Sequence, residues 1–162
     1  EKGGVMDLIL AAVVIGVVGT MVMDLGNVLF ARFGVISRID LGVLGRMARG
    51  WTRGRFRYAD PGEMEQTEHE AIYGFFTHYC IGVGLAVPYL FGWETLVGEP
   101  ASPTSALIYG ISTTVASWFL VYPALGLGVL GLKAGEGWKP AMSSFCNHVF
   151  YGLGLAIGLF LL

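Results

Sequence analysis

The stretch LILAAVVIGVVGTMVM, residues 8–23, carries no charge and is followed directly by Asp24. A helix of these residues is about 24 Å long, which falls short of the ~30 Å hydrocarbon core of a bilayer. A helix that continues through Asp24 to Ala31 is long enough to cross. No small-x-small cleavage site follows the apolar stretch, so we expect a retained span and no cleaved signal peptide. The sequence therefore predicts a transmembrane helix with an acid inside it.

Three further windows without charged side chains follow, at residues 71–93, 101–132 and 141–162. Each is long enough for a transmembrane helix, which needs about 20 predominantly apolar residues. The chain of 162 residues is 54% hydrophobic and only 14% charged, whereas an average soluble domain is about 25% charged. We predict one all-α integral membrane domain, residues 1–162, in which four transmembrane helices form a compact bundle. The expected spans are about 6–31, 71–93, 105–132 and 141–162, with an amphipathic, basic cytoplasmic loop at 32–70.

Positive charge is concentrated in two of the connections between these spans, and this sets the expected orientation. By the positive-inside rule, the first and third connections face the cytoplasm. The second connection, residues 94–100, contains no Lys or Arg, so it and both termini are predicted to lie outside the cytoplasm. The basic residues behind this prediction are Arg32, Arg38, Arg46, Arg49, Arg53, Arg55, Arg57, Lys133 and Lys139.

The first connection contains a predicted helix of its own. Residues 37–40 have the Ser-x-x-Asp form of a helix start, and apolar side chains then recur at helical spacing with arginines between them. This pattern is typical of a short amphipathic helix that lies on the membrane surface. Its apolar positions are Ile39, Val43, Leu44 and Met47.

The arginines of this connection are candidate contacts for lipids or anions. Arg46, Arg53, Arg55 and Arg57 can meet anionic headgroups, and each basic side chain contributes ~1 kcal/mol near such a surface. A sharper alternative is an anion or phosphate subsite made by the last three, because guanidinium forks match phosphate. Nucleic acid is not an expected partner, since the net charge is −2 and the basic stretch lies at a membrane.

Glycine is abundant, with 25 residues, and many of them lie within the predicted spans. Small residues let transmembrane helices approach closely, and Gly154 and Gly158 have the small-xxx-small spacing. We expect these glycines to pack the helices of one bundle, with a homo-oligomer or a larger membrane complex as the alternative. The other glycines of this group are Gly16, Gly19, Gly82, Gly84, Gly126, Gly128 and Gly152.

Three ionisable residues lie inside otherwise uncharged spans, and all three are expected at one depth. Asp24, His78 and His148 each lie seven positions from the predicted cytoplasmic end of their span, which is about 10 Å into the bilayer. Ionisable groups at such depth are costly and usually face a helix bundle's interior, so they mark a candidate functional site. Glu70 lies two turns before His78 on the same helical face, where it can act as a stepping stone. Pro123 is expected to kink the third span near this depth.

Three roles are open for this polar layer. It can be a structural cluster that gives the bundle its register. It can be a metal or cofactor site, because two imidazoles and a carboxylate suit iron, zinc or copper, and facing histidines can ligate haem. It can also handle protons or ions, with histidines that titrate near neutrality and a relay extended by Tyr122. Ser144 lies one turn from His148 on the same stripe, whereas Cys80 and Cys146 are each two residues from a histidine and face elsewhere.

Short motifs spread over the chain from Met6 onward occur in a known family, in order and at similar spacing. They are Met23-Asp24, Gly45-Arg46, Gly54-Arg55-Phe56-Arg57, Glu70, Gly74, His78-Tyr79, Pro123-Ala124-Leu125-Gly126-Leu127-Gly128, Ser144, His148, Phe150 and Gly152-Leu153-Gly154-Leu155. On these residues the chain resembles a bacterial family of small four-span inner-membrane proteins that is described as a domain of unknown function. The resemblance implies the inner (plasma) membrane and the four-span fold, and it brings no activity. Sequences of that family place a histidine after the Arg-Phe-Arg run, where this chain has Tyr58.

Two classes of function follow from these observations. The first is a metal-, cofactor- or proton-handling membrane protein, a transporter or an enzyme, whose site uses Asp24, His78 and His148 with Glu70 at the entrance. The second is a non-catalytic accessory subunit that glycine-rich helix faces hold in a larger membrane complex. The small size favours the second class, and the polar layer favours the first.

Overall fold

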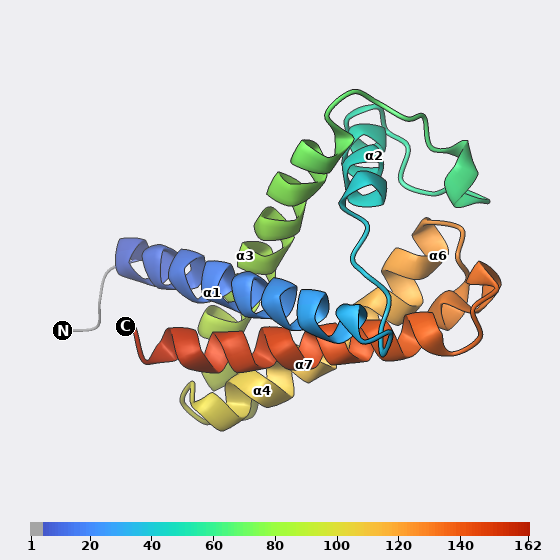
Figure 1. Ribbon diagram of the computed structural model, residues 1–162. Coiled ribbons are helices and arrows are strands. Elements are labelled where there is room, and N and C mark those ends of the chain that lie inside the picture. The colour runs from blue at the N-terminus through green and yellow to red at the C-terminus, as the bar shows by residue number, and fades with distance from the viewer. Residues whose placement is uncertain (1–4) are drawn as a thin grey trace. The chain divides into compact units, whose positions relative to one another are not determined.

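The computed structural model describes residues 5–162, which form helices and no strands (Figure 1). The longer helices are α1 (Val5–Arg32), α2 (Leu41–Thr52), α3 (Glu70–Val97), α4 (Pro103–Ser112) and α7 (Lys139–Leu159). The shorter segments are the 3-10 turns η1 (Pro61–Glu63) and η3 (Val129–Ala134), the turns α5 (Thr114–Ala116) and α6 (Tyr122–Ala124), and the π-helical segment η2 (Ser117–Val121). The chain divides into two compact units. Unit one holds the chain up to Gly26, Tyr79–Thr113 and Asn147–Leu162, and unit two holds Asn27–His78 and Thr114–Cys146.

Within residues 5–162, three segments are long and apolar enough to cross a membrane: Met6–Arg32, Glu70–Val97 and Pro103–Ala124. Four spans were predicted, and the fourth corresponds to α7, which is not among the three. The first half of α7 carries polar side chains that lower its average apolarity. These side chains, all of them buried, are Ser143, Ser144, Asn147 and His148.

The third predicted span, residues 105–132, ends earlier than expected. The long helical segment ends at Ala124. Two glycines after it, Gly126 and Gly128, adopt positive φ angles of +83° and +73°. Left-handed residues end helices, and glycine adopts this conformation without steric cost. The predicted boundary was therefore about eight residues too long, because the glycine-rich stretch after Ala124 is apolar without being part of the long helix.

The kink predicted at Pro123 takes the form of a π-helical segment. The N–H of Tyr122 donates to the carbonyl of Ser117, five residues back, where a regular α-helix would use the residue four back. Proline has no N–H, and its ring displaces the carbonyl of the residue four positions earlier. The wider turn directly before Pro123 accommodates that displacement.

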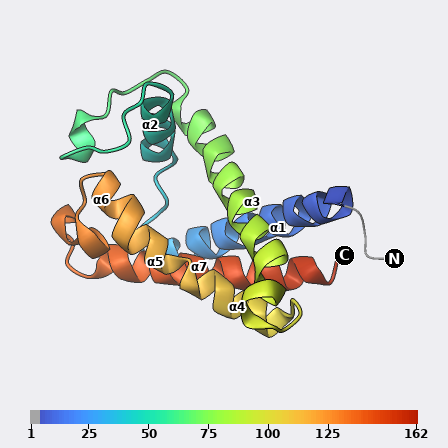
Figure 2. The same cartoon turned by 180° about the vertical axis from the view of Figure 1, so that it is seen from behind.

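In unit one, α1 and α7 lie side by side and antiparallel (Figure 1 and Figure 2). They contact each other at glycines. A Cβ added to Gly154 would lie 2.6 Å from the Cα of Gly19, and one added to Gly158 would lie 2.9 Å from the Cα of Ile15. Side chains do not fit at such separations, so the helices meet backbone to backbone. The small-xxx-small pair predicted from spacing therefore packs two helices of the same unit.

Helix α3 meets α1 in the same way. A Cβ added to Gly16 would lie 2.6 Å from the Cα of Val83, and the hydroxyl of Tyr151 donates to the carbonyl of Gly82 at 2.6 Å. The tyrosine thereby ties α7 to α3 through a buried hydrogen bond. Gly84 differs from its predicted role, because a Cβ there would have no neighbour within 4 Å.

Unit two begins with a short linker that leads into α2. The carboxylate of Asp40 accepts the N–H of Val43 at 3.0 Å and caps the helix. Ser37 was the predicted start of this helix, but it is not the cap. Its N–H donates to the hydroxyl of Ser143 at 2.8 Å, and its carbonyl accepts the side-chain amide of Asn27 at 3.0 Å. The linker is thus held by Asn27, at the start of one segment of unit two, and by Ser143, near the end of the other.

The apolar face of α2 is covered by protein. Met47 is buried in a core with Tyr58, Met64 and Leu125. Periodicity had predicted a helix lying on the membrane surface, and a helix is present, but these three side chains occupy the face expected to meet lipid. Both environments are apolar, so the pattern of Met47 and its neighbours fits either one.

Helix α2 also packs tightly against the first turns of α3. Gly45 and Gly74 face each other, because a Cβ added to either one would lie 3.0 Å from the backbone nitrogen of the other. The same Cβ atoms would overlap the carbonyl oxygens of Glu70 and Leu41, respectively. Glycine at both positions brings the arginine-bearing helix onto the start of a candidate membrane span.

Candidate functional site

The three predicted intramembrane residues are divided between the two units. Asp24 lies in α1 and His148 in α7, and both belong to unit one. His78 lies in α3 and is the last residue of the Asn27–His78 segment of unit two. His148 is buried, with 8% of its surface exposed, whereas Asp24 and His78 are half-buried. Asp24 and His148 can therefore be described together.

The carboxylate of Asp24 is held by a tyrosine from α3. The hydroxyl of Tyr79 hydrogen-bonds to Asp24. This pair lies one turn beyond the place where Thr20 of α1 packs against Gly82 of α3. A hydroxyl that donates to a carboxylate makes a charge-assisted hydrogen bond, which is stronger than a neutral one. Tyr79 was not among the predicted site residues, because its position next to a histidine does not reveal which residue faces α1.

The imidazole of His148 is held by a hydroxyl from α4. Oγ1 of Thr113 lies 2.7 Å from Nδ1 of His148 and 2.6 Å from the carbonyl oxygen of Gly110. A carbonyl oxygen can only accept, so the single hydroxyl proton of Thr113 points at Gly110. Nδ1 of His148 then carries a proton and donates it to Thr113. The neutral imidazole is therefore the Nδ1–H tautomer, and its basic lone pair is on Nε2.

These two hydrogen-bonded pairs lie at the same end of unit one. Along the antiparallel α1 and α7, Gly19 faces Gly154, and Gly26 packs against the ring of Phe150. Asp24 lies between the two α1 glycines, so its level on α7 is close to Phe150. The buried histidine is two residues from Phe150. An acid and an imidazole thus occupy neighbouring levels of this unit.

Metal-ligating side chains are dispersed in the part of the chain that the structure describes. Across residues 5–162, no three or more His, Cys, Asp or Glu side chains gather closely enough to hold a metal ion. Cys80 is exposed and Cys146 is half-buried, and both are free thiols. In unit one, Asp24 and His148 each hydrogen-bond to a hydroxyl group, those of Tyr79 and Thr113 respectively.

Glu70, the predicted stepping stone toward His78, is engaged at the start of α3. Its Oε2 lies 3.4 Å from Nε of Arg46 and accepts the backbone N–H of Thr67 at 3.2 Å. The ion pair is mostly shielded, with 15% of the Arg46 side chain and 26% of the Glu70 side chain exposed. Within unit two, Glu70 therefore ties α2 to α3 and holds the backbone that leads into α3.

Tyr122 and Ser144, the predicted supporting residues, meet in unit two. The hydroxyl of Tyr122 donates to the carbonyl of Pro140 at 2.8 Å and also hydrogen-bonds to Ser144. Nε1 of Trp118 donates to the carbonyl of Ala141 at 3.1 Å. These bonds join the irregular helix around η2 to the first turn of α7.

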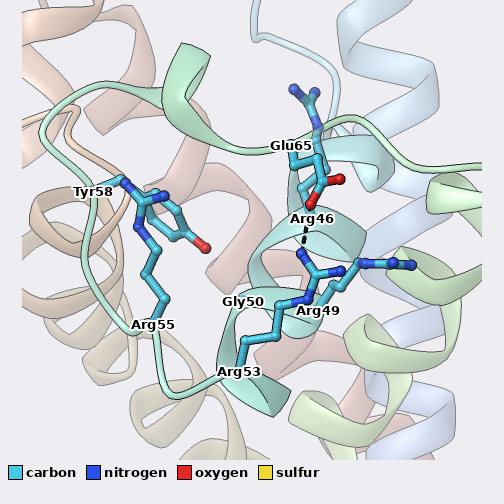
Figure 3. A pocket seen from close by; sticks show the side chains of 7 residues that line it. All are labelled: Arg46, Arg49, Gly50, Arg53, Arg55, Tyr58 and Glu65. Atoms are coloured by element: carbon cyan, nitrogen blue, oxygen red, sulfur yellow. Dashed lines mark hydrogen bonds and ion pairs between the residues drawn. The ribbon is translucent and has the colours of Figure 1, made fainter.

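A second candidate site lies at the end of α2 in unit two. It is a hollow of about 210 Å³ whose lining is mostly charged (Figure 3). Figure 3 shows Arg55 lying along the ring of Tyr58, with 4.5 Å between the guanidinium carbon and the ring centre, and Arg53 joined to Glu65. We call this site the arginine hollow, and its lining consists of Arg46, Arg49, Gly50, Arg53, Arg55, Tyr58 and Glu65.

The arginine hollow contains three of the four predicted anion contacts, and Arg57 is the exception. Arg46, Arg49 and Arg53 follow one another at intervals of three and four residues, which places them on one face of α2 and its C-cap. That spacing is visible in the sequence and could have added Arg49 to the prediction. The part played by Tyr58 depends on how the following loop folds back, which the spacing does not show.

The arginines of the hollow lower the pKa of its one carboxylate, that of Glu65. The Arg53 guanidinium holds the pKa of the Glu65 carboxyl below its usual value, first through the side-chain hydrogen bond and then through its charge, and Arg49 adds to the effect. Both partners are largely exposed, with 53% of the Arg53 side chain and 65% of the Glu65 side chain accessible. An ion pair so exposed contributes little to stability.

The whole of this architecture falls within one recognised family. The family model described as "Protein of unknown function (DUF2938)" matches residues 13–161. No curated protein and no solved structure matches the chain. The matched range includes Asp24, His148 and the arginine hollow, and the description of the family assigns no activity to them.

Proposed function

Because the chain belongs to the DUF2938 family, whose description assigns no activity, we propose its function from its own side chains. It is a small membrane protein that handles protons at the polar site of unit one, formed by Asp24, Tyr79, Thr113 and His148. The tautomer of His148 carries this proposal. Its Nδ1 proton is committed to Thr113, so Nε2 is the nitrogen that accepts a proton.

Protonation of this imidazole on Nε2 leaves the two hydrogen bonds of Thr113 unchanged. Thr113 accepts from Nδ1 and donates to Gly110 in the neutral state, and the same two bonds persist when Nε2 is protonated. Imidazoles ordinarily titrate near pH 6.5. An imidazole that gains and loses a proton without breaking its hydrogen bond to Thr113 is suited to passing protons on.

We further propose that α7 is a fourth membrane span. Its 21 residues make a helix of about 31 Å, which is long enough for the hydrocarbon core. Average apolarity counts polar side chains wherever they point, but Ser143, Ser144, Asn147 and His148 of α7 are buried within the protein. We place these four spans in the inner membrane of a bacterium. The arginine-rich connection then faces the cytoplasm, and both termini lie outside the cytoplasm.

Glycine contacts favour proton handling over the role of an accessory subunit. A docking subunit would present its glycine-rich helix faces to a partner. Gly154 and Gly158 of α7 instead face Gly19 and Ile15 of α1 within the same unit. These two glycines of α7 are therefore engaged by one of the protein's own helices.

A proton-flux measurement on reconstituted protein tests the proposal. The full chain is placed in liposomes that contain a pH-sensitive dye, and the decay of an imposed pH gradient is followed. We expect the wild-type protein to speed the decay relative to empty liposomes. His148→Ala should lower the rate at least tenfold. Thr113→Val should lower it severalfold, because the Nδ1–H tautomer is no longer imposed.

Two matched variants serve as controls. His69→Ala removes an exposed histidine outside the site, and Thr104→Val changes an exposed threonine of α4. Both should retain the wild-type rate. The proposal is wrong if wild-type liposomes decay no faster than empty ones, or if His148→Ala conducts as well as His69→Ala.

A further inference from the structure

We infer that the arginine hollow binds a phosphate group, carried either by a phospholipid headgroup or by a soluble anion. Four arginines line it against a single carboxylate, that of Glu65. Guanidinium groups donate paired, coplanar hydrogen bonds that match the oxygens of phosphate. This site is in unit two, and the inference does not depend on the proton chemistry proposed for unit one.

The backbone after α2 is folded so that it brings an additional arginine to the helix. The carbonyl of Gly50 accepts the N–H groups of Arg53 at 3.0 Å and Arg55 at 2.9 Å, and Gly54 between them has a left-handed φ of +74°. This turn sends the chain back over the end of α2. A Cβ added to Gly50 would overlap the hydroxyl of Tyr58, so glycine leaves room for the returning loop.

Arg55 is positioned before any ligand arrives. Its guanidinium lies over the ring of Tyr58 and also contacts Glu63 at 2.7 Å. Tyr58 is itself buried, and its N–H donates to the carbonyl of Ala124 at 2.8 Å. A side chain that is already ordered loses less conformational entropy when it binds a ligand.

The guanidinium groups of Arg49 and Arg53 can bind a ligand with little loss of existing interaction energy. Arg49 is exposed, and the partner of Arg53 is the exposed Glu65. Surface pairs of this kind contribute about 0–1 kcal/mol, so a phosphate that binds two forks can displace the carboxylate. The shielded pair of Arg46 with Glu70 is a structural contact and is expected to remain.

If α3 crosses a membrane, the hollow lies close to lipid phosphate groups. Helix α2 packs against the first turns of α3 through Gly45 and Gly74, and α3 is a candidate membrane span that begins at Glu70. The end of a span lies in the headgroup region of a bilayer. A phospholipid headgroup can therefore reach the site from the membrane, and a soluble phosphate can reach it from the aqueous side.

Two binding assays on the purified full chain distinguish these sources. In the lipid arm, native mass spectrometry in detergent compares retention of phosphatidylglycerol with that of diacylglycerol, which lacks the phosphate. In the soluble arm, calorimetry measures binding of inorganic phosphate. Retention of phosphatidylglycerol alone identifies a headgroup site, and binding of inorganic phosphate identifies a soluble-anion site. Either result supports the inference, and failure of both probes to bind the wild-type protein overturns it.

Matched variants locate the binding. The double variant Arg49→Gln/Arg53→Gln should weaken it at least tenfold. Arg57→Gln removes one positive charge from the same connection, outside the hollow, and should change affinity less than twofold. Equal losses in the double variant and in Arg57→Gln would mean a diffuse charge effect and would overturn the inference, as would an unchanged double variant.

The exposed positions of Arg49 and Arg53 make the glutamine variants compatible with the fold, and circular dichroism checks this. If the double variant is unfolded, Arg49→Lys/Arg53→Lys carries the test. Lysine keeps the charge but lacks the planar fork, so binding should weaken severalfold without being abolished. Lysine variants that bind as tightly as the wild-type protein would contradict recognition by guanidinium forks.

Discussion

At the scale of single residues, the charge state of Glu65 depends on the guanidinium of Arg53. The folded pKa of Glu65 is lowered from its ordinary value of 4.5. Its contribution to stability is therefore fully present above that value and is lost as the pH falls through the lower folded pKa. We expect Arg53→Gln to raise the pKa of Glu65 toward 4.5, which a ¹³C NMR titration of the carboxyl carbon measures.

The matched control for this titration is Arg38→Gln, which removes an exposed arginine earlier in the same connection. It should leave the midpoint of Glu65 unchanged. A midpoint that stays low in Arg53→Gln would show that another group holds the carboxylate in its charged form.

The candidate site of unit one could be predicted in part from single residues. Asp24 and His148 were recognisable because ionisable groups stand out in apolar spans. Their partners, Tyr79 and Thr113, were not, because hydroxyl groups are common in such spans. Which hydroxyl meets which ionisable group depends on how α4 is aligned with α7 and α3 with α1. Spacing along one helix carries no information about that alignment.

At the scale of helices, two glycines of α3 are expected to respond in opposite ways to the same change. Gly74→Ala places a Cβ against the carbonyl of Leu41 in α2, whereas Gly84→Ala places one in open space. Overpacking costs about 1–3 kcal/mol. Alanine in an uncrowded helix position gains about 0.5–1 kcal/mol over glycine. Thermal unfolding in detergent should show a lower midpoint for the first variant and an equal or higher midpoint for the second.

Gly84→Ala thus controls for the effect of alanine on helix α3 itself. If both variants shift the midpoint in the same direction by similar amounts, the close packing of α2 on α3 is not what stabilises unit two. Gly45→Ala probes the other side of the same contact and should behave like Gly74→Ala.

Elements were predictable from the sequence where their signal is local. The apolar windows predicted α1 and α3 well, and Pro123 predicted the irregular turn before it. The end of the third helix at Ala124 was missed, since the apolar residues beyond it continue the composition without continuing the helix. The period of α2 predicted its apolar face but not its partner, because lipid and a protein core select the same pattern.

At the scale of the whole molecule, the number of spans decides whether the two ends of this sequence lie on the same side of the membrane. If α7 crosses as proposed, there are four spans and both ends lie outside the cytoplasm. Alkaline phosphatase fused after Leu162, or inserted after Gly98 between α3 and α4, should then be active in a bacterial host. The enzyme matures only outside the cytoplasm, where its disulfides form.

A fusion at Gly135, between the third helix and α7, is the control and should be inactive. Activity at Gly98 without activity after Leu162 would mean that α7 does not cross, and that three spans place the ends on opposite sides. The sequence alone cannot decide this point. Composition counts polar residues of α7 such as His148 as unfavourable, although the His148 side chain is buried within the protein.

The backbone contacts of unit one have a consequence for mutational tolerance. Every residue other than glycine carries a Cβ, and at Gly16, Gly154 and Gly158 that atom would meet the main chain of a neighbouring helix. These positions have no conservative replacement, so even the smallest missense change is expected to be disruptive. Exposed positions of α1 such as Leu25, which is 70% exposed, should accept most apolar residues. A saturation-mutagenesis map of this chain would thus show its sharpest intolerance where the side chain is smallest.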